Sequence, residues 1–223
     1  MKIFNYSKYK DVTWDNEILG YISQIHEFKG RLSNIELKIK PKINKLVEIA
    51  KIQSTEASNK IEGIITTSTR IKQILNNKTT PKNRDEKEIL GYRDVLNTIH
   101  ENYEYIPIKS SYILQLHGDL YKFSERSIGG KFKNVQNYIS ETRTDGTSFV
   151  RFQPLAPYET PDAVDRLCEE FNISSSKYDV DPLILIPIFI LDFLCIHPFN
   201  DGNGRMSRLL TLLLLYKFGY NVG

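Results

Sequence analysis

Residues 197–208 read HPFNDGNGRMSR. This polar stretch separates an apolar segment that ends at Ile196 from a second apolar segment that runs to Phe218. Apolar segments of this length, bounded by polar and glycine-rich residues, favour helices that pack in a protein core. We therefore predict two buried helices, over residues 181–196 and 204–218, joined by a polar loop.

The glycines of this loop predict an anion-binding site. Gly202 and Gly204 carry no side chain, so a ligand can approach the backbone N–H groups closely. The helix that follows presents its unpaired N-terminal amides and the positive end of its dipole to the same place. Phosphate is the usual ligand of such a site.

Four side chains around the loop have chemistry that suits a phosphate ester. Arg205 and Arg208 are one helical turn apart, so both guanidinium groups can bind one polyanion. Asp201 offers a hard oxygen ligand for Mg²⁺, which favours one or two carboxylates together with substrate phosphates. His197 is a candidate general base near neutral pH. This set of groups predicts phosphoryl or nucleotidyl transfer.

A plainer interpretation is a turn between two core helices. His197 would then cap the first helix and Pro198 would stop it. This interpretation leaves the two arginines at helical spacing unexplained, as well as the gathering of a base, a carboxylate and an anion cradle in one loop.

The same segment resembles the Fic (filamentation induced by cAMP) family motif HxFx(D/E)GNGRxxR at every defining position. The resemblance implies that His197 deprotonates a target hydroxyl and that Asp201 coordinates Mg²⁺, or Mn²⁺, between the α- and β-phosphates of ATP. It implies that Gly202, Asn203 and Gly204 form the anion hole through their backbone and the Asn side chain.

The resemblance also separates the roles of the two arginines. Arg205 matches the arginine that contacts the phosphates, and Arg208 matches the one that reaches the γ-phosphate. Phe199 matches the aromatic residue that packs the loop onto the core. The implied reaction is AMPylation, in which AMP passes from ATP to a Ser, Thr or Tyr hydroxyl of a target protein and pyrophosphate is released.

A second motif precedes the core. Residues 58–63 read SNKIEG, similar to the (S/T)xxxE(G/N) inhibitory motif of many Fic proteins. Ser58 and Glu62 are four residues apart and would share a helix face. The resemblance implies that Glu62, followed by Gly63, forms a buried ion pair with Arg208 and so keeps ATP in a non-productive pose. In some family members this glutamate positions a water that removes AMP from the target, and the sequence leaves both roles open.

The rest of the chain has mostly helical periodicity. We predict a helix from a cap at Thr13 or Asp15 to Phe28, a second pattern after Gly30 in which Pro41 begins or kinks a helix, and a loop over residues 76–83. Further helices are predicted over residues 84–103, 109–123 and 160–171. A turn over 144–147 and a strand over 149–152 predict one β-hairpin. The expected fold is mainly α, a Fic-type helical bundle with one hairpin, or flap, before the catalytic loop.

The resemblance suggests two parts. Residues 1–79 would form an N-terminal helical region with the inhibitory helix at about 54–65, and residues 80–223 the catalytic core, with its C-terminal truncation left open. A target protein is expected to bind along the flap, at about 130–152, by strand addition. A homo-oligomer is a further expectation, and nucleic acid is expected only through a C-terminal domain outside this chain.

Composition adds broad limits. The chain has 223 residues, a net charge of +3 and a hydrophobic content of 40%, which fits a globular protein and gives no argument for a nucleic-acid partner. Its two cysteines lack metal-like spacing and fit a reducing compartment. No signal peptide or membrane span is expected, so the predicted location is the cytoplasm.

The remaining histidines and two lysines at the start of the flap have no pattern that predicts chemistry. His26, His100 and His117 lack metal-ligand spacing and are expected to be surface or hydrogen-bonded core histidines. Lys131 and Lys133 are expected to be solvated charges, with phosphate or target contact as the alternative.

Two alternatives to AMP transfer stay open. The same site could remove AMP or transfer another phosphate-containing group, although Gly204 argues against the Fic relatives that transfer a γ-phosphate. A nucleotide-binding regulatory or interaction module without turnover is the non-enzyme alternative.

Overall fold

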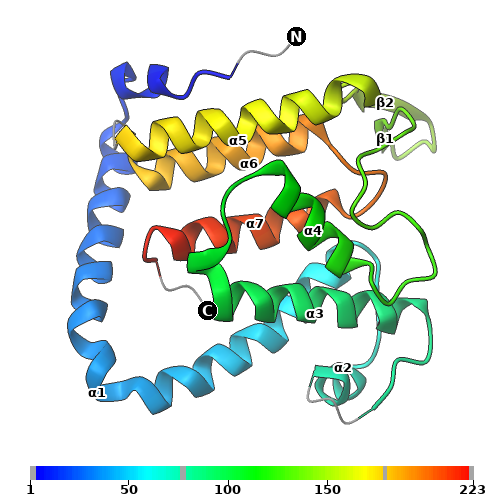
Figure 1. The fold of residues 1–223 in the computed structure, drawn as a ribbon, viewed down its shortest axis with the longest axis horizontal. Coiled ribbons are helices and arrows are strands. Elements are labelled where there is room, and N and C mark those ends of the chain that lie inside the picture. The colour runs from blue at the N-terminus through cyan, green and yellow to red at the C-terminus, as the bar shows by residue number, and fades with distance from the viewer. Residues whose placement is uncertain (1–3, 76–78, 178–179, 221–223) are drawn as a thin grey trace.

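The fold is described from a computed structural model, which covers residues 4–75, 79–177 and 180–220 and, inside one long helix, omits the side chains of 33–45. Figure 1 shows a mainly helical molecule with one hairpin, as the sequence predicts. In chain order the elements are η1 (Ser7–Asp11), α1 (Asn16–Ile61), α2 (Ser68–Leu75), α3 (Arg84–Asn102), η2 (Tyr103–Tyr105), α4 (Ser110–Leu120), β1 (Ile139–Thr142), β2 (Ser148–Phe152), η3 (Pro157–Glu159), α5 (Thr160–Lys177), α6 (Pro182–Ile196) and α7 (Asn203–Lys217).

Helix α7 lies at the centre of the bundle. It packs against α6 on one side and α3 on the other, and α5 covers α6 (Figure 1). Most leucines of α7 and both phenylalanines of α6 are fully buried, among them Leu210, Leu214, Phe189 and Phe193. The two apolar segments of the sequence are therefore the core helices that it predicts, and the polar loop between them lies at one end of the core.

Helix α1 differs from the prediction of two helices that meet near Gly30. It is one helix of 46 residues, and the Asp15 carboxylate caps it by accepting hydrogen bonds from the N–H groups of Glu17 and Ile18. Gly30 lies inside the helix with open space around it, so the glycine weakens the helix without ending it. Pro41 does not begin a helix, and its side chain lies outside the described residues.

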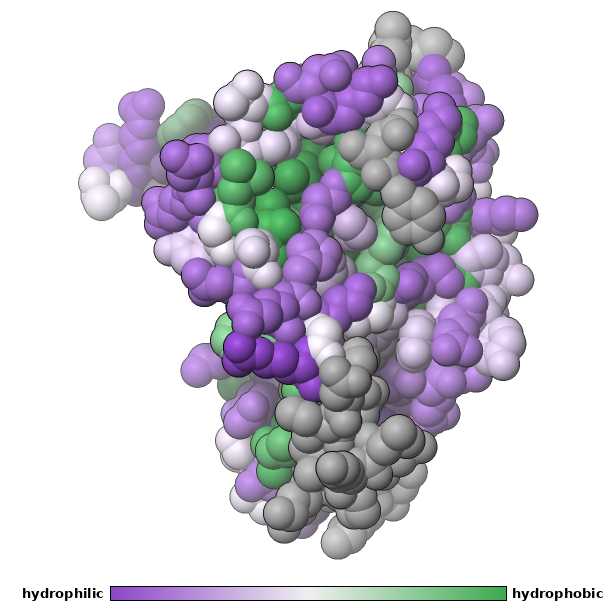
Figure 2. Space-filling model, turned by 90° about the vertical axis from the view of Figure 1, so that its left-hand side faces the viewer, coloured by the Kyte–Doolittle hydropathy of each residue, from purple (hydrophilic) through white to green (hydrophobic). Residues whose placement is uncertain are grey.

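Figure 1 shows α1 in two arms joined by a bend. We call residues 16–32 the first arm and residues 46–61 the second arm. Figure 2, which views the molecule from the side of the first arm in Figure 1, shows hydrophobic residues gathered among hydrophilic ones. The second arm packs against α3 and carries the SNKIEG motif toward α7.

The end of α1 explains why glycine follows glutamate in this motif. The Gly63 N–H bonds to the Lys60 carbonyl and the Ile64 N–H to the Asn59 carbonyl, the pair of bonds of a Schellman cap. Gly63 has a φ of +73°, which a left-handed cap residue requires. The helix therefore ends at Ile61 rather than near 65 as predicted, and Glu62 is its C-cap residue.

The flap is the antiparallel pair β1–β2, with Thr142 opposite Ser148. Its turn is the predicted one: Gly146 has a φ of +84°, and the Asp145 carboxylate accepts hydrogen bonds from the backbone and hydroxyl of Thr147. Nearly every flap residue is exposed. In the described part of the chain, no helix has both the length and the apolar character that a bilayer span requires.

Candidate functional site

The candidate site begins where α6 ends. His197 is the C-cap residue of α6, with φ 51° and ψ 63°, and it is the one non-glycine residue with positive φ in the described chain. This left-handed conformation costs about 1 kcal/mol for a residue with a Cβ. The structure therefore holds His197 in a strained position at the start of the loop, as active sites often do.

A segment that precedes the flap holds the loop in place. The Lys133 N–H donates to the Pro198 carbonyl at 2.8 Å, and Lys133 Nζ donates to the Ile196 carbonyl at 2.9 Å. The side-chain amide of Asn137 donates to the Phe199 carbonyl at 3.1 Å. Lys133 is buried, and burial lowers its pKa to about 8. The prediction of a solvated charge is therefore wrong for Lys133, whose ammonium donates to the Ile196 carbonyl beside His197 and to the Asn137 side-chain oxygen.

Asn203 closes the loop from its other end. Its side-chain oxygen accepts a hydrogen bond from the Phe199 N–H at 2.9 Å, and its Nδ2 donates to the Phe199 carbonyl at 2.8 Å. The side chain is buried. In this conformation the Asn203 side chain therefore holds the loop backbone in place.

His117, from α4, links the loop to the segment before the flap. Its Nδ1 accepts a hydrogen bond from the Gly130 N–H at 3.1 Å, so its Nε2 carries the proton and donates to the Asp201 carbonyl at 3.0 Å. Its ring stacks on Phe199 with centroids 3.7 Å apart. Burial lowers the pKa of His117 to about 4, so it is neutral at neutral pH. It is a satisfied core histidine, as predicted.

His197 itself is partly buried and suited to accept a proton. Burial lowers the pKa of His197 below its ordinary value, and the nearby Lys133 ammonium adds to this shift, while the Glu62 carboxylate opposes it. Neutral imidazole therefore predominates near neutral pH, which is the form that a general base needs.

Asp201 presents the carboxylate that would hold a metal. One oxygen, Oδ1, accepts a hydrogen bond from the Gly202 N–H at 2.7 Å, and Oδ2 pairs with Arg126 at 2.6 Å. The described residues contain no cluster of three or more His, Cys, Asp or Glu side chains that could hold a metal by themselves. A half-exposed single carboxylate fits Mg²⁺ or Mn²⁺ only when substrate phosphates supply further ligands.

The two arginines of α7 point to different places. Arg205 is 1% exposed, and its guanidinium lies 2.9 Å from the buried carboxylate of Glu88. Its Nη2 donates to the Tyr121 hydroxyl at 2.6 Å, and the guanidinium lies over the Tyr121 ring. The prediction that Arg205 and Arg208 point at one polyanion is therefore not met in this conformation, because Glu88 and Tyr121 hold Arg205 inside the core.

Arg208 meets the end of α1. Its Nη2 pairs with Glu62 Oε1 at 2.7 Å, its Nε donates to the Ser58 hydroxyl at 2.7 Å, and its Nη2 also bonds to the Ser58 carbonyl at 3.1 Å. The contact between Glu62 and Arg208 is present, but it is not buried, since the two side chains are 34% and 32% exposed. Ser58 is the buried member of the group.

Glu62 also lies over Gly204. A Cβ at position 204 would come within 2.3 Å of Glu62 Oε1, which a real side chain could not do. The carboxylate therefore occupies the space beside the first turn of α7, where the helix dipole and free amides favour an anion. Both Gly202, with a φ of +85°, and Gly204 are positions that a larger residue would disturb.

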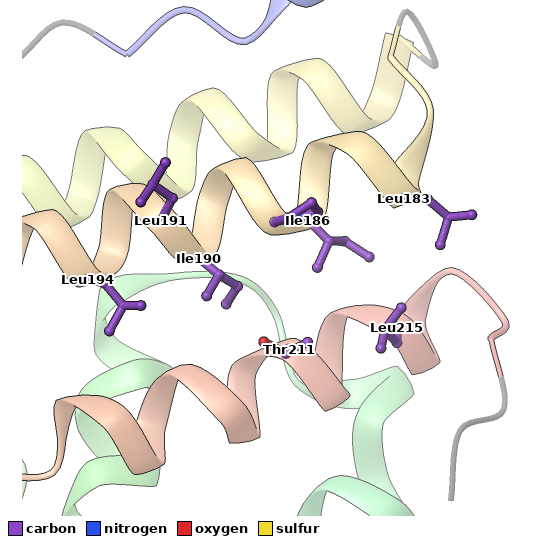
Figure 3. Close-up of a pocket in the computed structure, with 8 residues that line it drawn as sticks. Leu183, Ile186, Ile190, Leu191, Leu194, Thr211 and Leu215 are labelled. Atoms are coloured by element: carbon purple, nitrogen blue, oxygen red, sulfur yellow. The ribbon is translucent and has the colours of Figure 1, made fainter. Parts of the chain in front are cut away.

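A separate groove of about 360 Å³ runs between α6 and α7, and it lies apart from this chemistry (Figure 3). Its lining is aliphatic apart from the Thr211 hydroxyl, with Leu183, Ile186, Pro187, Ile190, Leu191, Leu194 and Leu215. Without a titratable group it offers no acid, base or metal ligand.

Sequence reasoning missed several residues of the site. Lys133, Asn137, Arg126, Glu88 and Tyr121 all contact the loop or its arginines. A weak signal existed for Lys133, which lies three residues after a glycine pair. The others lie in ordinary helical or loop sequence, and only the tertiary fold brings them to the site.

Comparison with known proteins identifies the domain. Residues 107–215, which include α4, the flap and the catalytic loop, match the family model of the Fic/DOC family. A crystal structure of a Fic-domain-containing signaling protein from Bacteroides thetaiotaomicron superposes with a TM-score of 0.75 at 26% identity, over 89% of this chain and 73% of that one. The chain therefore carries a Fic/DOC domain.

Two curated relatives extend the comparison. The protein adenylyltransferase Fic of Nematostella vectensis is 25% identical over 216 residues, which cover 92% of this chain and 46% of the relative. The protein adenylyltransferase fic-1 of Caenorhabditis elegans is 26% identical over 140 residues, which cover 61% of this chain and 25% of the relative. The chain thus spans between a quarter and about half of the length of these relatives.

Proposed function

We propose that the protein transfers AMP from ATP to a Ser, Thr or Tyr hydroxyl of a target protein. The observation that carries the proposal is that one loop brings together His197, the Asp201 carboxylate and the amino end of α7. A base, a metal ligand and an anion cradle are the parts that nucleotidyl transfer needs. The names of the curated relatives support the same activity.

His197 has the role of general base. It takes the proton of the target hydroxyl as the hydroxyl oxygen forms a bond to the α-phosphorus of ATP. The bond between that phosphorus and the bridging oxygen breaks, and pyrophosphate leaves with the electron pair. The lowered pKa of His197 keeps the imidazole ready to accept the proton.

Asp201 and α7 balance the phosphate charge. Mg²⁺, or Mn²⁺, would be held by the Asp201 carboxylate together with the phosphates and would neutralise charge on the leaving pyrophosphate. The first amides of α7, beside Gly202 and Gly204, would bind phosphate oxygens. Arg205 would reach them only by leaving Glu88 and Tyr121, so we propose that it instead fixes the start of α7.

Glu62 is proposed to restrain this activity. It holds Arg208 and fills the space over Gly204, so a γ-phosphate could not take either place while the contact lasts. Because each side chain of this ion pair is about one third exposed, the pair is weak, and water or a ligand can compete for either partner.

Removal of AMP is a second candidate, and the position of Glu62 favours it. The Glu62 carboxylate counteracts the burial that lowers the pKa of His197, so we propose that Glu62 and His197 orient a water between them. We also propose that the target protein adds a strand to the exposed flap. The proposed location of this reaction is the cytoplasm.

Labelling with ATP tests the proposal. Incubation of a cell lysate with α-labelled ATP should label protein when Glu62 is changed to Gly, and less so with the unchanged chain. The His197→Ala change in the same background should abolish the label. Equal labelling with and without His197, or label that comes from γ-labelled ATP instead, would contradict AMP transfer. A purified AMP-modified target should lose AMP with the unchanged chain and keep it with Glu62→Gly if removal is the activity.

A further inference from the structure

A positive charge lies directly against the Asp201 carboxylate. Arg126 pairs with it directly at 2.6 Å. A site built for a bare divalent cation would not place a guanidinium against its ligand, whereas a site for a metal bound to a polyphosphate would.

We propose that Arg126 exchanges partners when nucleotide binds: it neutralises Asp201 in the free protein and moves to the polyphosphate when the metal takes the carboxylate. The inference rests on the proposed function, because it assumes that Asp201 holds a metal and that the loop binds ATP. It adds a nucleotide-binding residue that the loop motif does not contain.

The geometry suits an exchange rather than a permanent link. The Arg126 and Asp201 side chains are 44% and 40% exposed, so their ion pair contributes at most about 1 kcal/mol. In the free protein both Asp201 oxygens are engaged, one by Arg126 and one by the Gly202 N–H. Because the guanidinium and a metal ion are both positive, a metal ion at Oδ2 repels Arg126, and the phosphates that bind with the metal offer the guanidinium a new partner.

The backbone that carries Arg126 is anchored, so only the side chain needs to move. The Gly130 N–H bonds to His117, and Gly129 lies so close to α4 that a Cβ would be 3.2 Å from the Gly118 carbonyl oxygen. The Arg126 N–H itself bonds to the Ser124 hydroxyl. A long, exposed arginine on a fixed loop can turn from a carboxylate to a phosphate and keep two donors for it.

The exchange predicts two affinity changes of opposite sign. With Arg126→Gln in the Glu62→Gly background, Mn²⁺ alone should bind up to about fivefold more tightly, because no guanidinium competes for Asp201. A non-hydrolysable ATP analogue, at saturating Mn²⁺, should bind several-fold more weakly, because a charge-assisted contact is lost. Mn²⁺ electron paramagnetic resonance and calorimetry measure the two affinities without any turnover.

Two controls make the result specific. Lys87→Gln removes a neighbouring surface cation that pairs with Glu125 and should change neither affinity. Asp201→Asn should weaken Mn²⁺ binding, and Arg126→Gln added to it should give no tightening. Unchanged affinities, or two changes in the same direction, would overturn the exchange. Failure of the nucleotide to bind any variant would instead overturn the proposed function.

Discussion

The catalytic loop and the flap are neighbours in the molecule, but they are built in opposite ways. The loop has no helix or strand of its own, but side chains from α4, α7 and the segment before the flap form hydrogen bonds to its backbone. The flap has regular β-pairing, yet nearly all its residues are exposed. Side-chain hydrogen bonds to the backbone therefore order the loop, whereas the flap keeps its hydrogen-bonding groups accessible to a target.

The largest effect should come from breaking the hold on the loop at Lys133. Lys133→Met keeps much of the buried volume but leaves the Ile196 carbonyl and the Asn137 side chain without their donor. We expect a loss of about 2 kcal/mol in the free energy of unfolding and loss of most AMP transfer. Denaturant unfolding and α-label transfer measure the two. Lys131→Met, the exposed lysine nearby, is the control and should change stability by less than about 0.5 kcal/mol.

A second test uses pH on His117. The pKa of His117 in the folded chain is about 4, below the ordinary 6.5. Between pH 6.5 and 4, this histidine therefore binds a proton in the unfolded chain but not in the folded chain. Stability should therefore fall as the pH drops from 6.5 to 4, by up to about 1.4 kcal/mol per pH unit for each such histidine. His117→Phe should flatten this slope and reduce AMP transfer.

His100 provides the matched comparison, because burial lowers its pKa to about 4 as well, and it lies away from the loop against Tyr216. His100→Phe should flatten the slope and leave AMP transfer intact. If both variants kept the full slope, the neutral buried state of these histidines would be wrong.

A smaller effect should appear at Gly204, where the loop meets Glu62. Gly204→Ala should lower the free energy of unfolding by about 1 kcal/mol in the unchanged chain, because its Cβ collides with the Glu62 carboxylate. In the Glu62→Gly background the same change should cost little or nothing, since the collision is gone. Thermal unfolding of the four chains of this double-mutant cycle gives the coupling, and additive effects would contradict the observed placement of Glu62.

The smallest effect on stability is expected in the flap. Val150 is more than half exposed, so Val150→Ala should change the free energy of unfolding by less than about 0.5 kcal/mol and leave ATP binding unchanged. Labelling of lysate protein in the Glu62→Gly background should fall if the target binds there. A stability loss of 2 kcal/mol or more would show that the flap is part of the structural core after all.

Local signals in the sequence predicted much of this structure. The Asp15 cap, the turn around Gly146 and the two apolar helices depend on residues within a few positions of one another, so their physics is contained in the pattern. The prediction that Glu62 contacts Arg208 depended instead on the resemblance of residues 58–63 to a known motif.

The failures share a cause. The sequence predicts a solvated Lys133 and a phosphate-binding Arg205 because charged residues are rarely buried, and the buried partners of both lie far along the chain. The continuity of α1 through Gly30 was missed because a glycine signals a helix end only as a preference, which a long helix can override. Long-range pairing and the tolerance of a helix for one weak residue are both set by the whole fold.

The carboxylate of Glu62 over Gly204 has a consequence for affinity. If a phosphate needs the same space, only the fraction of molecules in which Glu62 has withdrawn can bind ATP productively. The apparent dissociation constant is then the intrinsic one divided by that fraction, however well the rest of the site fits. Any partner that draws the end of α1 away from α7 would raise apparent affinity for ATP without touching the nucleotide, and by the same coupling ATP would tighten the grip of that partner.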